Sequence, residues 1–119
     1  MQARPSPSHR LIVLDVAIEA IATARPLVTR IRRFDRDLGE QLRRALSSTA
    51  LNIGEGGHSE GGNRNRISRF STAAGSAAEA RAGLRVATAW GYVEAGEVEA
   101  IDALLDRVAR MLHGLGARR

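Results

Sequence analysis

The spacing of apolar residues constrains the fold most strongly, because it follows a helical period along nearly the whole chain. Four segments carry this pattern, at about residues 11–33, 35–53, 63–90 and 94–115. None of them shows the strict alternation that is typical of a strand. Helices of about twenty residues are roughly 30 Å long, and short connections make consecutive helices antiparallel neighbours. The pattern therefore predicts an all-α fold, an antiparallel up-down-up-down four-helix bundle.

Local signals predict where these helices begin, bend and end. Asp35 is a good N-cap for the second segment, whose apolar stripe runs from Leu38 to Ile53. Pro26 predicts a kink or break in the first segment, because proline lacks a backbone donor and clashes with the preceding turn. The glycine cluster that starts at Gly54 predicts the end of the second helix, with the residues after it in a turn. Gly91 is placed as the residue that ends the third helix.

The length and termini of the chain indicate one domain with a short tail. Residues 1–8 contain two of the three prolines and no apolar periodicity, so we expect a disordered tail there and a single bundle over residues 9–119. No stretch of eighteen apolar residues occurs, which predicts a cytoplasmic protein without a membrane span. The absence of cysteine excludes disulfides and thiolate sites.

The positive charge is concentrated in the first part of the chain. All eighteen basic residues are arginine, and residues 1–70 hold twelve of them against seven acids, whereas residues 71–119 hold six of each. A one-sided electropositive surface of this kind favours a polyanion partner, RNA or DNA. Aromatic residues make up only 3% of the chain, and this composition argues against base-stacking platforms.

Arginine pairs with phosphate through a planar fork of donors and stays charged at any working pH. The arginines of the first part of the chain are therefore the candidate nucleic-acid-binding residues, with contacts mainly to phosphate. They are Arg32, Arg33, Arg36, Arg43, Arg44, Arg64, Arg66 and Arg69. The alternative is that these side chains are ordinary solvated and intersubunit residues of a protein-interaction scaffold with no nucleic-acid role.

Motifs for catalysis, metal or cofactor binding are weak. Glu55 and His58 have the E-x-x-H spacing of di-metal carboxylate sites, but such sites need the motif twice and on helices. The glycine-rich stretch around them lacks the lysine and the preceding strand of nucleotide-binding loops. No G-x-S-x-G motif occurs. We therefore expect a non-enzymatic protein with no catalytic residue, metal or cofactor, in which Glu55 and Glu79 cap backbone donors or pair with arginines.

Four short motifs, in register, resemble one protein family. They are QLRRA at 41–45, LNIGEG at 51–56, AGSAAE at 74–79 and WGY at 90–92. This order is similar to that of the bacterial four-helix-bundle family named after proteins encoded in intervening sequences of large-subunit ribosomal RNA genes. The chain has Gly54 where the family usually has alanine and Trp90 where leucine is common. The resemblance covers nearly all of the chain beyond residue 10.

The resemblance implies a four-helix bundle that assembles into a ring-shaped homopentamer. Its relatives include accessory proteins of diversity-generating retroelements, so it also makes a reverse transcriptase a candidate partner beside nucleic acid. The positions that match the family motifs are taken as structural and assembly positions. Besides Arg43 and Arg44 they are Gln41, Asn52, Glu55, Gly56, Gly75, Ser76 and Glu79. The function predicted first is an oligomeric nucleic-acid-binding accessory protein.

Overall fold

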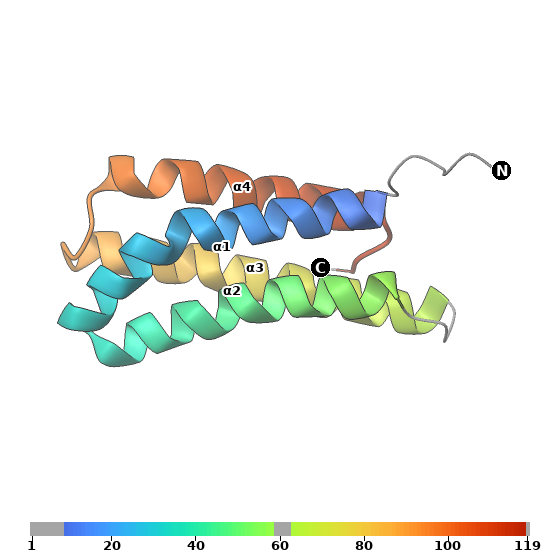
Figure 1. Cartoon of the computed structure of the whole chain (residues 1–119), viewed down its shortest axis with the longest axis horizontal. Coiled ribbons are helices and arrows are strands. Elements are labelled where there is room, and N and C mark those ends of the chain that lie inside the picture. The colour runs from blue at the N-terminus through green and yellow to red at the C-terminus, as the bar shows by residue number, and fades with distance from the viewer. Residues whose placement is uncertain (1–8, 59–62, 119) are drawn as a thin grey trace, which may run out of the picture.

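The computed structural model describes residues 9–58 and 63–118, and within these residues the chain forms four α-helices. They are α1 (His9–Phe34), α2 (Arg36–Gly57), α3 (Asn63–Ala89) and α4 (Ala95–Gly114). Successive helices run in opposite directions, and the turns after α1 and after α3 lie at the same end of the molecule (Figure 1). The predicted tail, residues 1–8, lies outside the described residues.

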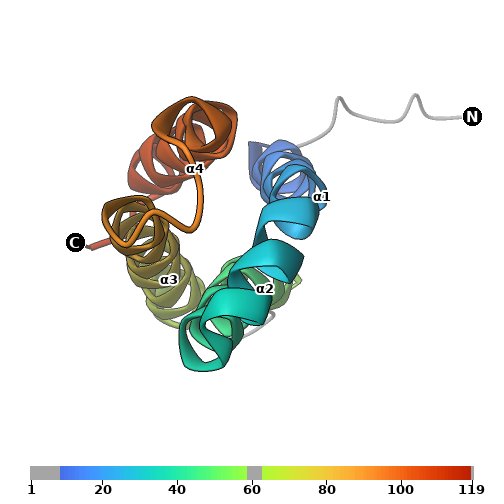
Figure 2. The ribbon, with the colours of Figure 1, turned by 90° about the vertical axis from the view of Figure 1, so that its left-hand side faces the viewer.

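The four helices surround a common core (Figure 2). α2 packs against α1 and α3, and α4 closes the bundle against the same two helices. This arrangement confirms the predicted all-α bundle. None of the described helices has the length and apolar character needed to cross a membrane.

The core consists of the apolar positions that the helical spacing brings to one side of each helix. The stripe predicted for α2 is buried throughout, from Leu38 to Ile53. Leu84 of α3 and Ile101 of α4 face it from the other side of the bundle and are fully buried. The helical spacing of α1 also includes Ile18 among its apolar positions, but this residue is 51% exposed. Burial of the remaining apolar surface is the main favourable contribution to folding.

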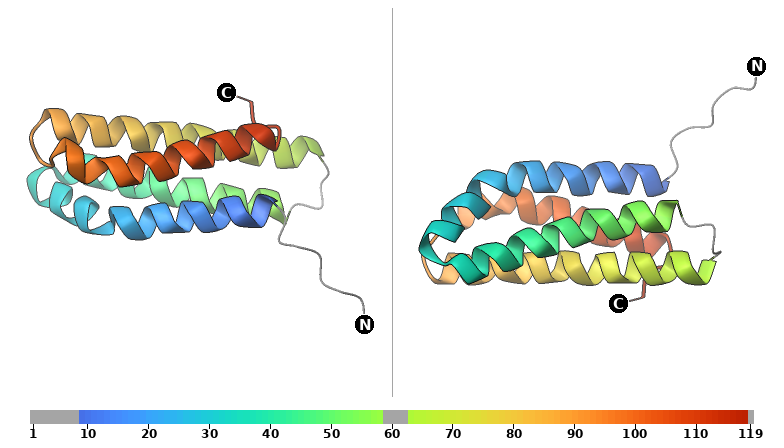
Figure 3. Two further views of the ribbon diagram at one scale, coloured as in Figure 1. Left: turned by 90° about the horizontal axis from the view of Figure 1, so that it is seen from above. Right: turned by 60° about the horizontal axis from the view of Figure 1, so that its bottom comes forward.

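The predicted break at Pro26 is absent, because α1 is one continuous helix through this residue. The proline is exposed, and so is Ala22, whose carbonyl loses its helical partner at this point. Solvent can therefore hydrogen-bond the group that proline leaves unpaired. The helix changes direction in its C-terminal part (Figure 3), which agrees with the predicted kink.

The predicted helix ends are formed by local hydrogen bonds. Asp35 caps α2, since its Oδ1 accepts a hydrogen bond from the backbone N–H of Leu38 at 3.0 Å. At the end of α3, the N–H of Tyr92 donates to the carbonyl of Ala87 at 3.0 Å, and Gly91 has a φ of +82°. That left-handed conformation favours glycine and completes a Schellman cap.

Two glycines allow α2 and α3 to approach closely. A Cβ atom at Gly56 would lie 2.6 Å from the ring of Phe70, and one at Gly83 would lie 2.7 Å from Leu42 Cδ2. Close packing at Gly56 also explains a correction to the predicted boundary. α2 continues through Gly54 and ends at Gly57, so the E-x-x-H stretch begins in the helix and not in a turn. Packing of Phe70 against the backbone offsets the helical cost of glycine.

Substituting these neighbouring glycines tests the close approach. Gly54 has open space where a Cβ would lie, so Gly54→Ala should stabilise the protein by about 0.5–1 kcal/mol through helix propensity. Gly56→Ala should destabilise it by about 1–3 kcal/mol because the new methyl overpacks against Phe70. Urea unfolding monitored by circular dichroism measures both. Equal effects of the two substitutions would contradict the packing of α2 on α3.

Candidate nucleic-acid interface

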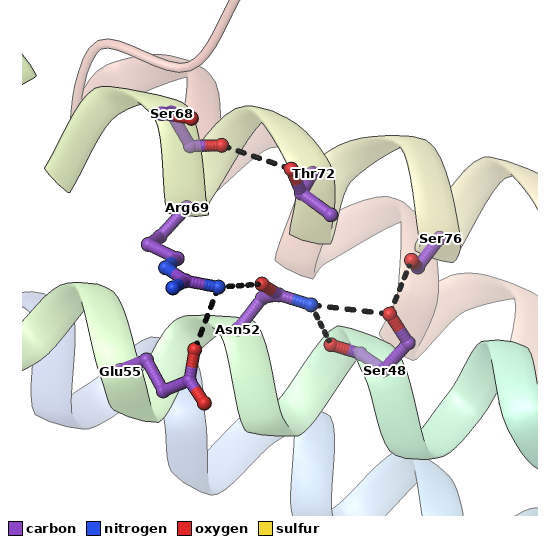
Figure 4. Close-up of polar contacts among 7 residues, drawn as sticks. All are labelled: Ser48, Asn52, Glu55, Ser68, Arg69, Thr72 and Ser76. Carbon is purple, nitrogen blue, oxygen red and sulfur yellow. Dashed lines mark hydrogen bonds and ion pairs between the residues drawn. The ribbon is translucent and has the colours of Figure 1, made fainter. Parts of the chain in front are cut away.

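A chain of polar side chains runs along the contact between α2 and α3, and we call it the polar seam (Figure 4). Asn52 Nδ2 donates to the carbonyl of Ser48 at 2.9 Å and to its Oγ at 3.1 Å. The Ser48 Oγ lies 2.8 Å from the Oγ of Ser76 on α3. Arg69 Nη1 forms an ion pair with Glu55 Oε2 at 2.8 Å and lies 3.5 Å from Asn52 Oδ1. These five side chains meet because spacings of three, four and seven residues share a helix face.

Beside the polar seam the surface is hollowed into a recess of about 460 Å³, which we call the α2–α3 recess. Its cationic side chains are Arg43 and Arg44 from α2 and Arg69 from α3. Ser48 and Asn52 add hydroxyl and amide groups, and Glu55 is its one acid. Guanidinium, hydroxyl and amide donors that converge on one hollow form a site suited to a phosphate group.

The predicted arginines divide into engaged and available cations. Arg32 forms an ion pair with Glu40 at 2.9 Å, and Arg69 is held by the polar seam. Arg43 Nε lies 3.7 Å from the same Glu40, but its side chain is 61% exposed. Arg66 is half-buried on α3. Among these candidate arginines, the exposed ones without an ion pair or side-chain hydrogen bond to a described residue are Arg33, Arg36, Arg44 and Arg64.

The structure brings only part of the predicted set together. Arg43, Arg44 and Arg69 converge on the α2–α3 recess. Arg36 lies in the first turn of α2, at the end of the bundle shown toward the viewer in Figure 2, and Arg64 lies in the first turn of α3 at the other end. The available cations therefore comprise Arg33 at the end of α1, Arg36 and Arg44 in the first half of α2, and Arg64 at the opposite end of the bundle.

Two arginines outside the candidate set form ion pairs with acids of α4. Arg30 of α1 donates two hydrogen bonds to Glu97, at 2.8 and 2.9 Å. Arg81 of α3 contacts both oxygens of Asp102, at 2.8 and 3.1 Å, and Asp106 at 3.2 Å. Arg30 and its partner Glu97 are 67 residues apart in the sequence, so no local pattern could have revealed this pair.

These contacts shift the ionisation of the groups involved. The hydrogen bonds from Arg30, together with the backbone N–H of Glu94, lower the pKa of Glu97 to about 2. The same contact raises the pKa of Arg30. Hydrogen bonding to Asp102 raises the pKa of Arg81. Both arginines thus act as fixed ties between α4 and its neighbours.

The family-motif positions have different environments. Gly56 is buried against Phe70, and Ser76 and Asn52 belong to the polar seam, while Gly75 is half-buried on α3. The predicted pairing of Glu55 with an arginine is confirmed. Gln41 and Glu79 are exposed and make no polar contact with the described residues. Among residues 9–58 and 63–118 no group of three or more histidines and acids is placed to hold a metal ion.

A family model described as the 23S rRNA-intervening sequence protein matches residues 10–114. The chain belongs to this family. The match spans α2, α3 and α4 completely and all of α1 except its first residue. It confirms the family resemblance that the four motifs indicated. No curated protein and no solved structure gives a significant match. The relation to retroelement accessory proteins stays a prediction.

The pKa of Glu97 predicts an acid-sensitive tie between α1 and α4. Because this pKa is lowered to about 2 from an ordinary 4.5, the ionised carboxylate stabilises the fold above pH 4.5, and this contribution is lost as the pH falls through 2. Urea midpoints of the parent should therefore decline more between pH 4.5 and 2 than those of Glu97→Gln. Glu79→Gln, at an exposed acid without an ion pair, is the control and should follow the parent. Parallel pH profiles of the parent and Glu97→Gln would contradict the tie.

Proposed function

We propose that the protein is a nucleic-acid-binding accessory factor that holds a sugar-phosphate backbone in the α2–α3 recess and along α2. The observation that carries this proposal is the convergence of Arg43, Arg44 and Arg69 on one hollow. Ser48 and Asn52 of the polar seam line the same hollow, where they hydrogen-bond to each other, and Asn52 accepts a hydrogen bond from Arg69. Each guanidinium can bind a phosphate through two parallel hydrogen bonds.

The charges beside the recess favour an incoming anion. The acids of α2 are Asp37, in the first turn where the helix dipole favours it, and Glu40 and Glu55, which already form ion pairs. Arg36 and Arg44 therefore form no ion pair with any described residue. A phosphate that approaches them breaks no existing ion pair.

Arg69 can also turn toward a ligand at low cost. Its ion pair with Glu55 lies at the surface, where both side chains are about half exposed. Exposed pairs of this kind contribute about 0–1 kcal/mol to stability. A phosphate can replace the Glu55 carboxylate as the partner of Arg69 without disturbing the core.

Contacts of this kind position a nucleic acid but do not select its sequence. The proposal therefore covers both RNA and DNA. The family name refers to ribosomal RNA, and it is the one observation that favours RNA. A reverse transcriptase as a protein partner stays a prediction from the resemblance.

Charge reversal on α2 tests the proposal. The parent should bind an RNA hairpin and a DNA duplex with an affinity that falls steeply between about 50 and 200 mM salt, because phosphate contacts release counterions. Arg36→Glu combined with Arg44→Glu should weaken binding at least about tenfold and flatten the salt dependence. Fluorescence anisotropy of labelled nucleic acids measures the affinity, and circular dichroism checks the helical content.

A charge-matched variant on the other side of the bundle is the control. Arg85 of α3 and Arg107 of α4 are exposed and have no ion pair with any described residue. Arg85→Glu combined with Arg107→Glu changes the net charge by the same amount and should bind nearly as the parent does. Equal losses in the two double variants would mean that net charge and not the α2 surface is responsible. Absence of binding by the parent at low salt would contradict the function itself.

An apolar groove between α1 and α2 favours self-association as a second property. The groove has a volume of about 630 Å³ and is lined mainly by Leu14, Ile18, Ile21, Ala50 and Leu51. Ile18 and Leu51 are more than half exposed in the single chain. Exposed apolar surface rimmed by polar residues is typical of protein interfaces. We propose that a second copy of this chain covers the groove, which the resemblance to a homopentamer family also implies.

A charge placed in the groove tests this assembly. Ile18→Arg should reduce the mass measured by light scattering after size-exclusion chromatography from that of an oligomer to that of a monomer, because it would bury an unpaired charge in the interface. Val86→Arg, at another exposed apolar position on α3, is the control and should leave the mass unchanged. An oligomer that persists in Ile18→Arg would place the interface elsewhere.

A further inference from the structure

Three of the four aromatic residues stack at one end of the bundle, and we call them the aromatic ladder. Phe34 and Tyr92 have ring centroids 5.3 Å apart with planes inclined by 5°, and Tyr92 and Trp90 lie 6.4 Å apart with an inclination of 20°. Phe34 ends α1, and the other two rings belong to the turn between α3 and α4. Both turns lie at the end that faces the viewer in Figure 2.

The ladder is held in place before any ligand arrives. The hydroxyl of Tyr92 lies 3.4 Å from Asp35 Oδ2, while Asp35 Oδ1 caps α2. The Schellman cap at Gly91 fixes the backbone between Trp90 and Tyr92. Partial burial, reinforced by the Asp35 carboxylate, raises the pKa of Tyr92, so its hydroxyl stays protonated and able to donate. Rings fixed in this way lose little conformational entropy when a ligand binds.

The outer rings of the ladder are open to solvent. Phe34 is 62% exposed and Trp90 is 69% exposed, whereas Tyr92 between them is half-buried. The position of Tyr92 is explained by its structural role, because its ring connects the two turns. This structural role does not require Phe34 and Trp90 to have outer faces that are exposed. Those faces can extend the stack by a further planar group.

We propose that the aromatic ladder binds unpaired nucleobases of a single-stranded segment by stacking. Its nearly parallel rings have the geometry in which planar bases stack. Arg33 and Arg36 lie on either side of Phe34 in the sequence, and both are exposed and have no ion pair within the described chain. The arginines of α2 begin at this end, so a strand in the α2–α3 recess can continue onto the ladder.

The charges at this end indicate that stacking dominates the contact. Asp37 and Glu94 are exposed here beside the two arginines, so the end is not a strongly positive surface. Binding at the ladder should therefore depend on bases more than on phosphate charge. This inference rests on the proposed function, which supplies nucleic acid as the partner. Dependence on unpaired bases distinguishes binding at the ladder from the phosphate contacts of the recess.

The protein offers a direct reporter, because Trp90 is its single tryptophan. A single-stranded oligonucleotide of about twelve nucleotides, within the usual range for such sites, should quench the fluorescence of Trp90 as it binds. Inorganic polyphosphate, which carries charge but no bases, should leave the emission unchanged. Phe34→Ala should weaken oligonucleotide binding at least about fivefold. Thr23→Ala, at an exposed position in the middle of α1, is the control and should not weaken it.

Anisotropy of the labelled oligonucleotide, recorded in the same titration, separates the two proposals. Binding without quenching of Trp90 would overturn the ladder inference and leave the proposed function standing. Equal quenching by polyphosphate would also overturn it. No binding by either signal would overturn both proposals. A shift of Trp90 emission that depends on protein concentration, without a response to oligonucleotide, would assign the ladder to contacts between copies and overturn its role in base stacking.

Discussion

The close packing of α2 against α3 is the constraint on which the rest of the structure depends. Gly56 and Gly83 remove the side chains that would hold the two helices apart. At this separation short hydroxyl side chains such as Ser48 and Ser76 can hydrogen-bond across the contact. The same proximity brings Arg69 next to α2 and creates the α2–α3 recess. The family-motif residues at this contact therefore have a structural role first, and the candidate binding site is a consequence of it.

Ion pairing divides the remaining surface into two electrostatic regions. Arg30 and Arg81 are committed to acids of α4, where their hydrogen bonds tie neighbouring helices together. On the side of α2, Glu40 and Glu55 are engaged with Arg32 and Arg69, and further arginines stay exposed beside them. On α2 itself, Arg36 and Arg44 have no ion pair, and Asp37 is the one acid of that helix without one. Such a distribution attracts a polyanion to one side of the bundle.

Features fixed by neighbouring residues could be predicted from the sequence, and features fixed by distant residues could not. The Asp35 cap and the Gly91 turn depend on contacts within a few residues, and the stripe of α2 follows from the spacing of that helix's own apolar residues. The exposure of Ile18 depends on where α2 lies. The continuation of α2 through Gly54 depends on the packing of the Phe70 ring from α3 against Gly56, two residues further on.

Composition alone does not show how the aromatic residues are arranged. A content of 3% counts the rings but does not show that Phe34, Trp90 and Tyr92 come from two turns that meet at one end of the bundle. The sequence likewise does not show which arginines form ion pairs, because the predicted arginines share a charge but lie in different environments. The sequence thus identified the nucleic-acid-binding hypothesis and the structure identified which arginines are free to serve it.

A map of the arginine side chains by nuclear magnetic resonance tests the central claim most directly. The Nε–H signals of all arginines are recorded while an RNA hairpin is added to the intact protein. The account predicts that the signals of Arg36, Arg43 and Arg44 shift with the added RNA, while those of Arg85 and Arg107 stay in place. Shifts that gather on α3 and α4, or no shift at any arginine, would contradict it.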